Sequence, residues 1–236
     1  MYLLVCNAGS TSLKFKLFEM PAEKVLAEAK VERIGRRNNG IFTYKNPVCN
    51  GERHLEKVDI PTYTEGIQLF LDCMLSDDET IGALSDISKI EKVGFKTVLA
   101  PGYSVHVIDE QVEARMREFL DVAPAHNGPY LEAVSHFRKL LPDAVLVGAF
   151  ETAFHETIPL ERKIYAVPYE WYEKYGFQRM GYHGASHSYV SETIELKFGS
   201  TDKMISCHLG GSCSLCAIDE GKSVDTTFGL SLQNLS

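Results

Sequence analysis

The sequence predicts a mixed α/β protein in which helices pack against a mixed β-sheet. Its first part contains short segments that are apolar or that alternate between apolar and polar residues, which is typical of strands. Segments with the helical spacing of apolar residues follow, and they alternate with further short apolar segments. Strands followed by alternating helices and strands favour a mixed sheet flanked by helices.

Three strands are expected first. Residues 2–6 are apolar and predict a buried strand, whereas residues 13–19 alternate between apolar and polar side chains and predict a half-buried strand. A Gly/Ser turn separates these two segments. Residues 25–34 allow a third strand, and the polar, irregular residues 35–55 predict a hairpin or a loop.

Helices and strands alternate in the next part of the chain. A helix is expected at 64–75 because its apolar residues recur on one face. Pro129 suits the first turn of a helix, which predicts that a helix begins there. The other expected elements are a strand at 93–99, helices at 109–119 and 129–141, and a strand at 144–150.

A short repeat predicts a second, related unit. Residues 205–215 resemble residues 4–13 when one inserted residue is allowed, since each is an apolar strand, a Gly/Ser turn and an alternating strand. On these residues alone, a true repeat and a coincidence are equally open. The repeat predicts a first domain at 1–150 and an incomplete second domain at 151–236, which includes a helix at 186–198.

The composition is ordinary for a soluble globular protein. The chain has 236 residues, of which 44% are hydrophobic, and a formal net charge of −8, with no basic stripe to favour nucleic acid. No apolar run reaches the roughly 18 residues of a membrane span, and residues 1–6 lack the features of a signal peptide. The six cysteines are scattered, which predicts reduced thiols and a cytoplasmic protein.

The turn between the first two strands has residues that suit a phosphate group. Gly9 lets the backbone approach a ligand closely, and the N–H groups of the turn can converge on an anion. The hydroxyl groups of residues 10–12 add donors, and Lys14 adds a positive charge. Asn7 can orient a metal-bound water or a phosphate oxygen. The alternative is a polar hairpin turn without a ligand, which is favoured for an isolated Gly-Ser turn.

Several motifs occur in order along the chain. They are Asn7–Lys14, Val122–Asn127, Phe150–His155, Tyr165–Gly176, Gly181–His187, Cys207–Ser214 and Gly221–Thr226. Together they resemble the motifs of acetate kinases, which belong to the actin/sugar-kinase ATPase superfamily. The resemblance covers essentially the whole chain but only the amino-terminal part of a typical family member.

This resemblance implies an actin-like ATPase domain of the ribonuclease H-like fold, with a mixed sheet flanked by helices, followed by an incomplete second copy. It implies transfer of the γ-phosphoryl group of ATP to a short-chain carboxylate with Mg²⁺, which depends on positioning and charge neutralisation. The residues implied to contact the nucleotide phosphates are Asn7, Ser10, Ser12, Lys14, His208, Gly210 and Gly211. The implied catalytic residues are Lys96, Glu151 and His183, the pocket residues are Ala125, His126 and Tyr182, and the metal ligands are Asn7 and Glu151.

Four residues depart from the family pattern. Lys96 stands where the family has an arginine, and it keeps the charge but loses the planar two-point fork. Glu151 replaces an aspartate, and its extra methylene displaces the carboxylate in a reaction that is sensitive to shifts of about 1 Å. Gly211 replaces an asparagine of the second hairpin, and Ala125 replaces a leucine of the substrate pocket. Lower activity is therefore expected.

Two interpretations of the function follow, and whether the chain is an enzyme stays open between them. The first is a phosphotransferase that is impaired or needs a complementary chain, and the second is a non-catalytic relative that binds a ligand or a partner. An exposed apolar edge where the second domain stops is expected to favour a homodimer or a complementary carboxy-terminal chain. For His183, the alternative to a role at the phosphoryl group is a helix-start capping pair with His187.

Overall fold

The computed structural model of the protein describes residues 1–97, 99–122 and 124–230. Contacts within the chain group it into two compact units. The first unit comprises residues 1–97, 105–120 and 124–148, and the second comprises residues 98–104, 121–123 and 149–236.

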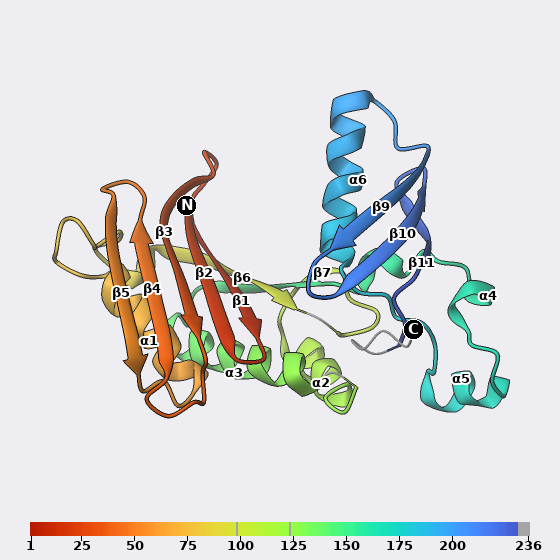
Figure 1. Ribbon diagram of the computed structural model, residues 1–236, viewed down its shortest axis with the longest axis horizontal. Helices are drawn as coiled ribbons and strands as arrows, with labels where there is room; N and C mark the ends of the chain where they lie inside the picture. The colour runs from red at the N-terminus through yellow and green to blue at the C-terminus, as the bar shows by residue number, and fades with distance from the viewer. Residues whose placement is uncertain (98, 123, 231–236) are drawn as a thin grey trace. The chain divides into compact units, whose positions relative to one another are not determined.

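The first unit is built on an eight-stranded sheet in the order β5-β4-β3-β2-β1-β6-β8-β7 (Figure 1). Strand β1 pairs antiparallel with β2 and parallel with β6, so the sheet is mixed, as predicted. Strands β1 to β5 are Tyr2–Gly9, Ser12–Glu19, Lys24–Glu32, Gly40–Asn46 and Gly51–Val58. Strands β6 to β8 are Ile90–Thr97, Val105–Val107 and Val145–Phe150.

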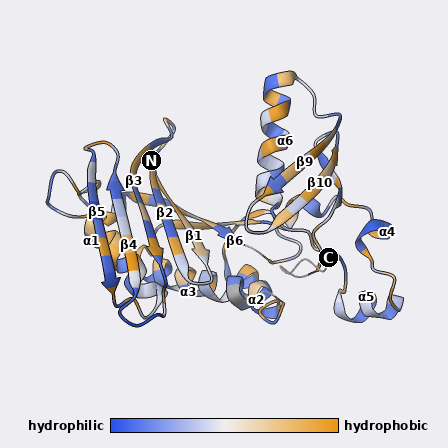
Figure 2. Ribbon diagram, viewed as in Figure 1, coloured by the Kyte–Doolittle hydropathy of each residue, from blue (hydrophilic) through white to orange (hydrophobic). Residues whose placement is uncertain are grey.

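Alternation along the strands gives this sheet one buried face. In β2, Leu13, Phe15 and Leu17 are buried, while Lys14 and Lys16 between them are exposed. Successive side chains of a strand point to opposite faces, so this pattern confirms the half-buried strand that the sequence predicted. Figure 2 shows hydrophobic residues recurring among hydrophilic ones along the first strands.

Helices α1 and α3 pack against the buried face of the sheet. Phe15 of β2 stacks on Phe70 of α1 with 4.5 Å between ring centroids, and it meets the ring of Phe137 of α3 edge-on at 6.5 Å. These aromatic contacts join both helices to the strand that follows the first turn. The helical elements of this unit are α1 (Tyr63–Met74), η1 (Ile87–Lys89), α2 (Glu110–Glu118) and α3 (Pro124–Leu140).

The structure tests two predictions from the sequence, one for residues 35–55 and one for Pro129. The polar segment 35–55 forms a hairpin, because it supplies β4 and part of β5. The predicted helix start at Pro129 is wrong, since α3 begins at Pro124 and Pro129 lies inside it. A proline suits the first turn because its missing N–H has no partner within the helix there, and Pro124 occupies that position instead.

The second unit contains a three-stranded antiparallel sheet in the order β11-β10-β9 (Figure 1). The hairpin of β9 and β10 closes at Leu209 and Cys213, around one more loop residue than the first hairpin, which closes at Gly9 and Ser12. This difference is the inserted residue of the repeat, so β9–β11 reproduce the order of β1–β3. The strands are β9 (Lys203–Leu209), β10 (Cys213–Asp219) and β11 (Lys222–Thr226).

Short helices precede this sheet in the second unit. They are η2 (Ala153–His155), α4 (Leu160–Lys163) and α5 (Tyr169–Tyr175), followed by the longer α6 (Gly184–Phe198). None of the helices in the described residues is both long enough and apolar enough to span a membrane. All six cysteines are free thiols.

Candidate functional site

The first hairpin brings polar groups together in a tight turn. Gly9 is the register partner of Ser12, and Ser10 lies exposed in the turn between them. A Cβ at Gly9 would lie 2.8 Å from Ser12 Oγ, so the Ser12 side chain would have to move to admit one, whereas the backbone of Ser12 would be at the ordinary distance of 3.8 Å. The hydroxyl of Tyr63 in α1 donates a hydrogen bond of 2.6 Å to the carbonyl oxygen of Gly9. This bond fastens the turn to the helix beneath it.

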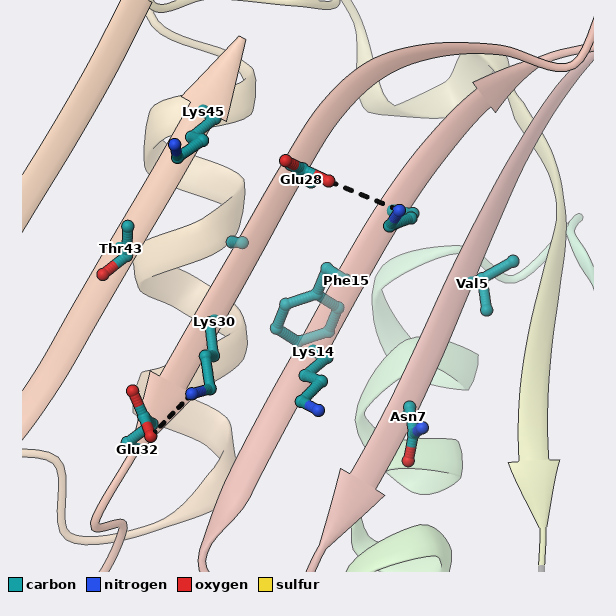
Figure 3. Close-up of a pocket in the computed structure, with 11 residues that line it drawn as sticks. Val5, Asn7, Lys14, Phe15, Glu28, Lys30, Glu32, Thr43 and Lys45 are labelled. Carbon is teal, nitrogen blue, oxygen red and sulfur yellow. Dashed lines mark ion pairs between the residues drawn. The ribbon is translucent and has the colours of Figure 1, made fainter. Parts of the chain in front are cut away.

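Asn7 and Lys14 are register partners on the two strands of this hairpin. Both line a cavity of about 580 Å³ on the sheet face that carries the lysine side chains (Figure 3). The hydroxyl of Tyr130 in α3 donates a hydrogen bond of 3.1 Å to Asn7 Oδ1. An amide oxygen has two lone pairs, so this bond orients Asn7 and leaves room for a second donor or a cation.

Lys14 differs from the other lysines of this cavity. Among the described residues it has no acidic partner, so its ammonium group is available to an anionic ligand. An unpaired ammonium group next to hydroxyl and backbone donors suits a phosphate. The other lysines form ion pairs, which join Lys16 to Glu28 at 3.4 Å, Lys30 to Glu32 at 2.8 Å and Lys45 to Glu52 at 2.8 Å.

The other predicted residues of the first unit lie near Asn7. Strands β1 and β6 are parallel neighbours, and their register pairs the residues that immediately precede Asn7 and Lys96. Lys96 is therefore at the same edge of the sheet as Asn7. His126 precedes Tyr130 by one turn of α3, and Tyr130 contacts Asn7. Ala125 lies in that same turn, and its side chain is outside the described part of the structure.

In the second unit, Glu151 is tied to the start of α6. It directly follows β8 and its exposed fraction is 5%. The N–H group of Gly184 donates a hydrogen bond of 3.0 Å to the carbonyl oxygen of Glu151. A Cβ at Gly184 would lie only 2.0 Å from that oxygen, so the contact requires glycine. It brings the backbone of Glu151 next to the residue before Gly184, which is His183.

His183 is held by its backbone, by ring stacking and by a hydrogen bond at Nδ1. It is the N-cap residue of α6, with a left-handed φ of 58°, and its side chain makes no capping hydrogen bond. Its ring stacks on His208, with 3.9 Å between ring centroids. Its Nδ1 atom lies 2.9 Å from Ser214 Oγ. The side chain of His183 therefore does not cap α6.

Two buried histidines support this site. The sequence interpretation considered His187 only as a capping partner of His183 and assigned no role to His155. His187 is fully buried, and its ring nitrogens contact Ser206 Oγ at 2.9 Å and Ser214 Oγ at 2.8 Å. Burial lowers the pKa of His187 to about 4, with smaller contributions from the neighbouring histidines. Burial also lowers the pKa of His155 to about 4. Both rings are therefore neutral at pH 7.

One sequence signal could have found the serine partners of these rings. Ser206 and Ser214 are buried on the neighbouring strands β9 and β10, where the alternation of side chains places them on the inward face. A serine at an inward strand position needs a hydrogen-bond partner. The sequence alone does not say that the partner is His187.

The remaining predicted residues of the second unit are a buried tyrosine and two exposed glycines. Tyr182 is fully buried, and its hydroxyl donates a hydrogen bond of 2.9 Å to the carbonyl oxygen of Leu230. Burial raises the pKa of Tyr182 above its usual range. Gly210 and Gly211 lie exposed in the loop between β9 and β10. A Cβ at Gly211 would meet no atom within 4 Å, so this position has room for a side chain.

The predicted site residues thus form two sets, one in each unit. The set in the first unit is Asn7, Ser10, Ser12, Lys14, Lys96, Ala125 and His126. The set in the second unit is Glu151, Tyr182, His183, His208, Gly210 and Gly211. Within each set, the contacts described above bring most of the members to one place.

The residues present suit Mg²⁺ that is bound together with a phosphate ligand. Among the described residues, no three or more histidine, cysteine or acidic side chains form a cluster that could hold a metal ion. Mg²⁺ is commonly held by one or two carboxylates together with substrate phosphates and water, so such a cluster is not required. The amide oxygen of Asn7 in the first unit and the carboxylate of Glu151 in the second unit are each an oxygen ligand of the kind that Mg²⁺ prefers.

The fold defines a class of protein. A mixed sheet that begins with a polar Gly/Ser hairpin, followed by a second sheet that opens with the same hairpin, is the architecture of an actin-like ATPase. A family model with the description Acetokinase family matches residues 2–234, and the chain belongs to that family.

Known relatives and solved structures agree with this assignment. The chain is 40% identical over 235 residues to the acetate kinase of Halothermothrix orenii, a match that covers 98% of this chain and 58% of the relative. The crystal structure of Porphyromonas gingivalis acetate kinase superposes with a TM-score of 0.88 at 33% identity, covering 98% of this chain and 58% of that one. A propionate kinase from Francisella tularensis superposes with a TM-score of 0.87 at 28% identity and the same coverage. The chain therefore spans a little over half the length of the relatives it matches.

Proposed function

We propose that this chain binds the phosphates of ATP with Mg²⁺ and takes part in phosphoryl transfer to a short-chain carboxylate. The observation that carries the proposal is the hairpin at Asn7 and Lys14, in a chain of the Acetokinase family. Its lysine has no acidic partner among the described residues, and the hydroxyls of Ser10 and Ser12 belong to the same hairpin. These features suit an anion better than they suit a turn without a ligand.

Each set of residues has a part in this reaction. Lys14, the turn N–H groups and the hydroxyls of Ser10 and Ser12 hold the nucleotide phosphates, and the exposed loop at 210–211 supplies further backbone donors. His183 contacts the phosphoryl group that is transferred, and His208 is one of the residues that bind the nucleotide phosphates. Asn7 and Glu151 are the proposed protein ligands of Mg²⁺, which would supply positive charge to the phosphate oxygens when bound.

The carboxylate substrate is held in the same proposal by Lys96, with His126, Ala125 and Tyr182 around the acyl group. The ammonium group of Lys96 attracts the carboxylate as a point charge but does not fix its plane, as the arginine of the family would. Glu151 carries one methylene more than the family aspartate. Slow transfer is therefore expected, since misplacement by about 1 Å costs roughly a hundredfold in rate.

A second polypeptide is part of the proposal. β9 is the edge strand of its sheet, and the side chains of Ile205 and Leu209 on it are 70% and 76% exposed. Exposed apolar residues on an edge strand favour association. We infer a homodimer or a complementary carboxy-terminal chain as the partner.

The phosphotransfer proposal is tested by reconstitution. The chain is mixed with a polypeptide made from the remaining part of the Halothermothrix orenii acetate kinase, and acyl phosphate formation is measured with ATP, Mg²⁺ and acetate. Acyl phosphate is expected in the mixture, and its absence there would count against a split phosphotransferase. A mixture that contains Lys14→Met in place of the wild-type chain is the matched control.

The alternative function is that of a non-catalytic relative that binds a ligand or a partner. The three exchanges at Lys96, Glu151 and Gly211 favour it, because each alters a group that the family uses. Calorimetric titration of the chain with ATP and Mg²⁺, with phosphate and with acetate separates the two functions. Tight binding of one of these ligands without turnover in the reconstituted mixture favours the alternative.

A further inference from the structure

We propose that Ser206, His187 and Ser214 form a directed hydrogen-bond chain that holds His183 as the tautomer with its proton on Nε2. The catalytic role of this tautomer rests on the proposed function, because that function places His183 at the phosphoryl group. The tautomer itself is a property of the folded chain and can be measured without any reaction. Ser206, His187 and Ser214 are then positioning residues.

Three hydrogen bonds in series join these four side chains. Ser206 Oγ lies 2.9 Å from His187 Nδ1, His187 Nε2 lies 2.8 Å from Ser214 Oγ, and Ser214 Oγ lies 2.9 Å from His183 Nδ1. The first three residues are almost completely buried, with exposed fractions of 3%, 0% and 2%. Only His183, at the outer end, is half-buried. Water therefore has little access to the three inner side chains of this hydrogen-bond chain.

The number of available protons decides in which direction the hydrogen bonds are donated. Each serine hydroxyl has one proton to donate, and neutral His187 has one ring proton. If that ring proton were on Nδ1, it would point to Ser206, and the hydroxyl proton of Ser206 would have no acceptor among the described residues. A buried donor without an acceptor carries a desolvation penalty. This arrangement is therefore disfavoured.

The opposite direction gives every proton an acceptor. Ser206 donates to His187 Nδ1, His187 Nε2–H donates to Ser214 Oγ, and Ser214 donates in turn to His183 Nδ1. Hydrogen bonds that run in one direction also polarise and strengthen one another. Because Nδ1 of His183 is then an acceptor, the proton of its neutral ring is on Nε2.

This tautomer matters for an anionic ligand. An Nε2–H group can donate a hydrogen bond to a phosphoryl oxygen, whereas an unprotonated Nε2 would present a lone pair to that oxygen. The ring is also fixed in its plane, since it stacks on His208 with 21° between the ring planes. The hydrogen-bond chain thus holds His183 as a neutral donor before a ligand binds. No reorganisation of the ring is then needed during phosphoryl transfer.

The test is nitrogen NMR of the full chain labelled with ¹⁵N-histidine. Long-range ¹H–¹⁵N spectra distinguish Nδ1–H, Nε2–H and doubly protonated rings, and the signals of His183 are identified by their loss in His183→Gln. At pH 7, His183 and His187 are both expected as Nε2–H rings. An Nδ1–H ring, or comparable amounts of both tautomers, at His183 of the wild-type chain would overturn the inference.

Variants test whether the hydrogen-bond chain causes the preference of His183 for the Nε2–H tautomer. Ser214→Ala should turn the single tautomer of His183 into a mixture, and Ser214→Thr, which keeps a hydroxyl, should restore it. Ser206→Ala does not touch His183, yet it should weaken the preference there as well. Ser188→Ala, at a half-buried position of α6 where Ser188 bonds to Glu192 and not to the histidines, should change nothing. A folded Ser214→Ala protein with the wild-type pattern at His183 would contradict the proposal.

The outcome is separable from the proposed function. If His183 is an Nε2–H ring but the protein never supports phosphoryl transfer, the tautomer inference is confirmed. The tautomer then has no catalytic role. Transfer in the reconstituted mixture with an Nδ1–H ring would keep the function and refute the hydrogen-bond chain. If Ser214→Ala does not fold, the spectra of the wild-type chain and of Ser214→Thr still decide the matter.

Discussion

The N–H group of Gly184 donates a 3.0 Å hydrogen bond to the carbonyl oxygen of Glu151. This bond joins the residue after β8 to the first residue of α6, so it restrains the backbone next to His183 and the backbone of Glu151. A Cβ on Gly184 would lie 2.0 Å from the bonded oxygen, which is part of the backbone and has little freedom to move.

Gly184→Ala is therefore expected to destabilise the protein by about 1–3 kcal/mol, the usual cost of forcing an extra carbon into a packed site. Urea unfolding followed by circular dichroism measures the change in the free energy of unfolding. Gly211→Ala is the matched control, since a Cβ there meets no atom within 4 Å and should leave the stability nearly unchanged. Equal stability of both variants would show that the contact at Gly184 is not a constraint.

Lys14→Met is expected to weaken binding of ATP with Mg²⁺, or of phosphate, by about tenfold or more, because a charge-assisted hydrogen bond contributes about 1.5–3 kcal/mol. Isothermal titration calorimetry gives both affinities. Lys16→Met is a close control, because Lys16 is on the same strand and face but is paired with Glu28. Loss of affinity in both variants alike would point to the overall charge of the face rather than to the hairpin.

Lys96→Arg is expected to lower the KM for the carboxylate in the reconstituted mixture by about tenfold, since a guanidinium group can bind a carboxylate through two parallel hydrogen bonds. Glu151→Asp should act mainly on kcat, because it changes the position of a group at the phosphoryl centre. Initial rates at varied acetate concentration separate the two effects. Lys92→Arg, an exposed exchange on the same strand β6, should have no effect on either constant.

The stability of the protein should fall in mild acid. Burial lowers the pKa of His155 and of His187 to about 4, below the value near 6.5 of an unfolded histidine. Between these values the unfolded chain binds more protons than the folded one, so stability rises with pH in this range. It is fully present above pH 6.5 and is lost as the pH falls towards 4.

Urea unfolding at pH 7, 5.5 and 4.5 measures this loss, which is of the order of 3 kcal/mol for each ring. His187→Gln should flatten the profile, because it removes one of the two buried rings. His54→Gln serves as the control, since His54 is exposed on β5 and should leave the profile unchanged. A stability that does not vary between pH 7 and 4.5 would contradict the neutral buried rings.

Local features of the sequence determined much of this fold. Alternation predicted the strand at 13–19, because the side-chain period of a strand is a property of the backbone. The repeat of the Gly/Ser hairpin, with its inserted residue, appears as the longer loop between β9 and β10. The family motifs placed the chain among the acetokinases, which the family match confirms.

The tertiary structure decided what depends on residues far apart in the chain. The position of Pro129 inside α3 was not readable from helix rules, since proline at the start of a helix and proline inside it differ only in what surrounds them. The hydrogen bonds of His187 to Ser206 and Ser214 likewise follow from the packing of α6 on the second sheet. Periodicity shows which residues turn inward, but only packing shows which buried polar groups meet, because each buried donor must find an acceptor in three dimensions.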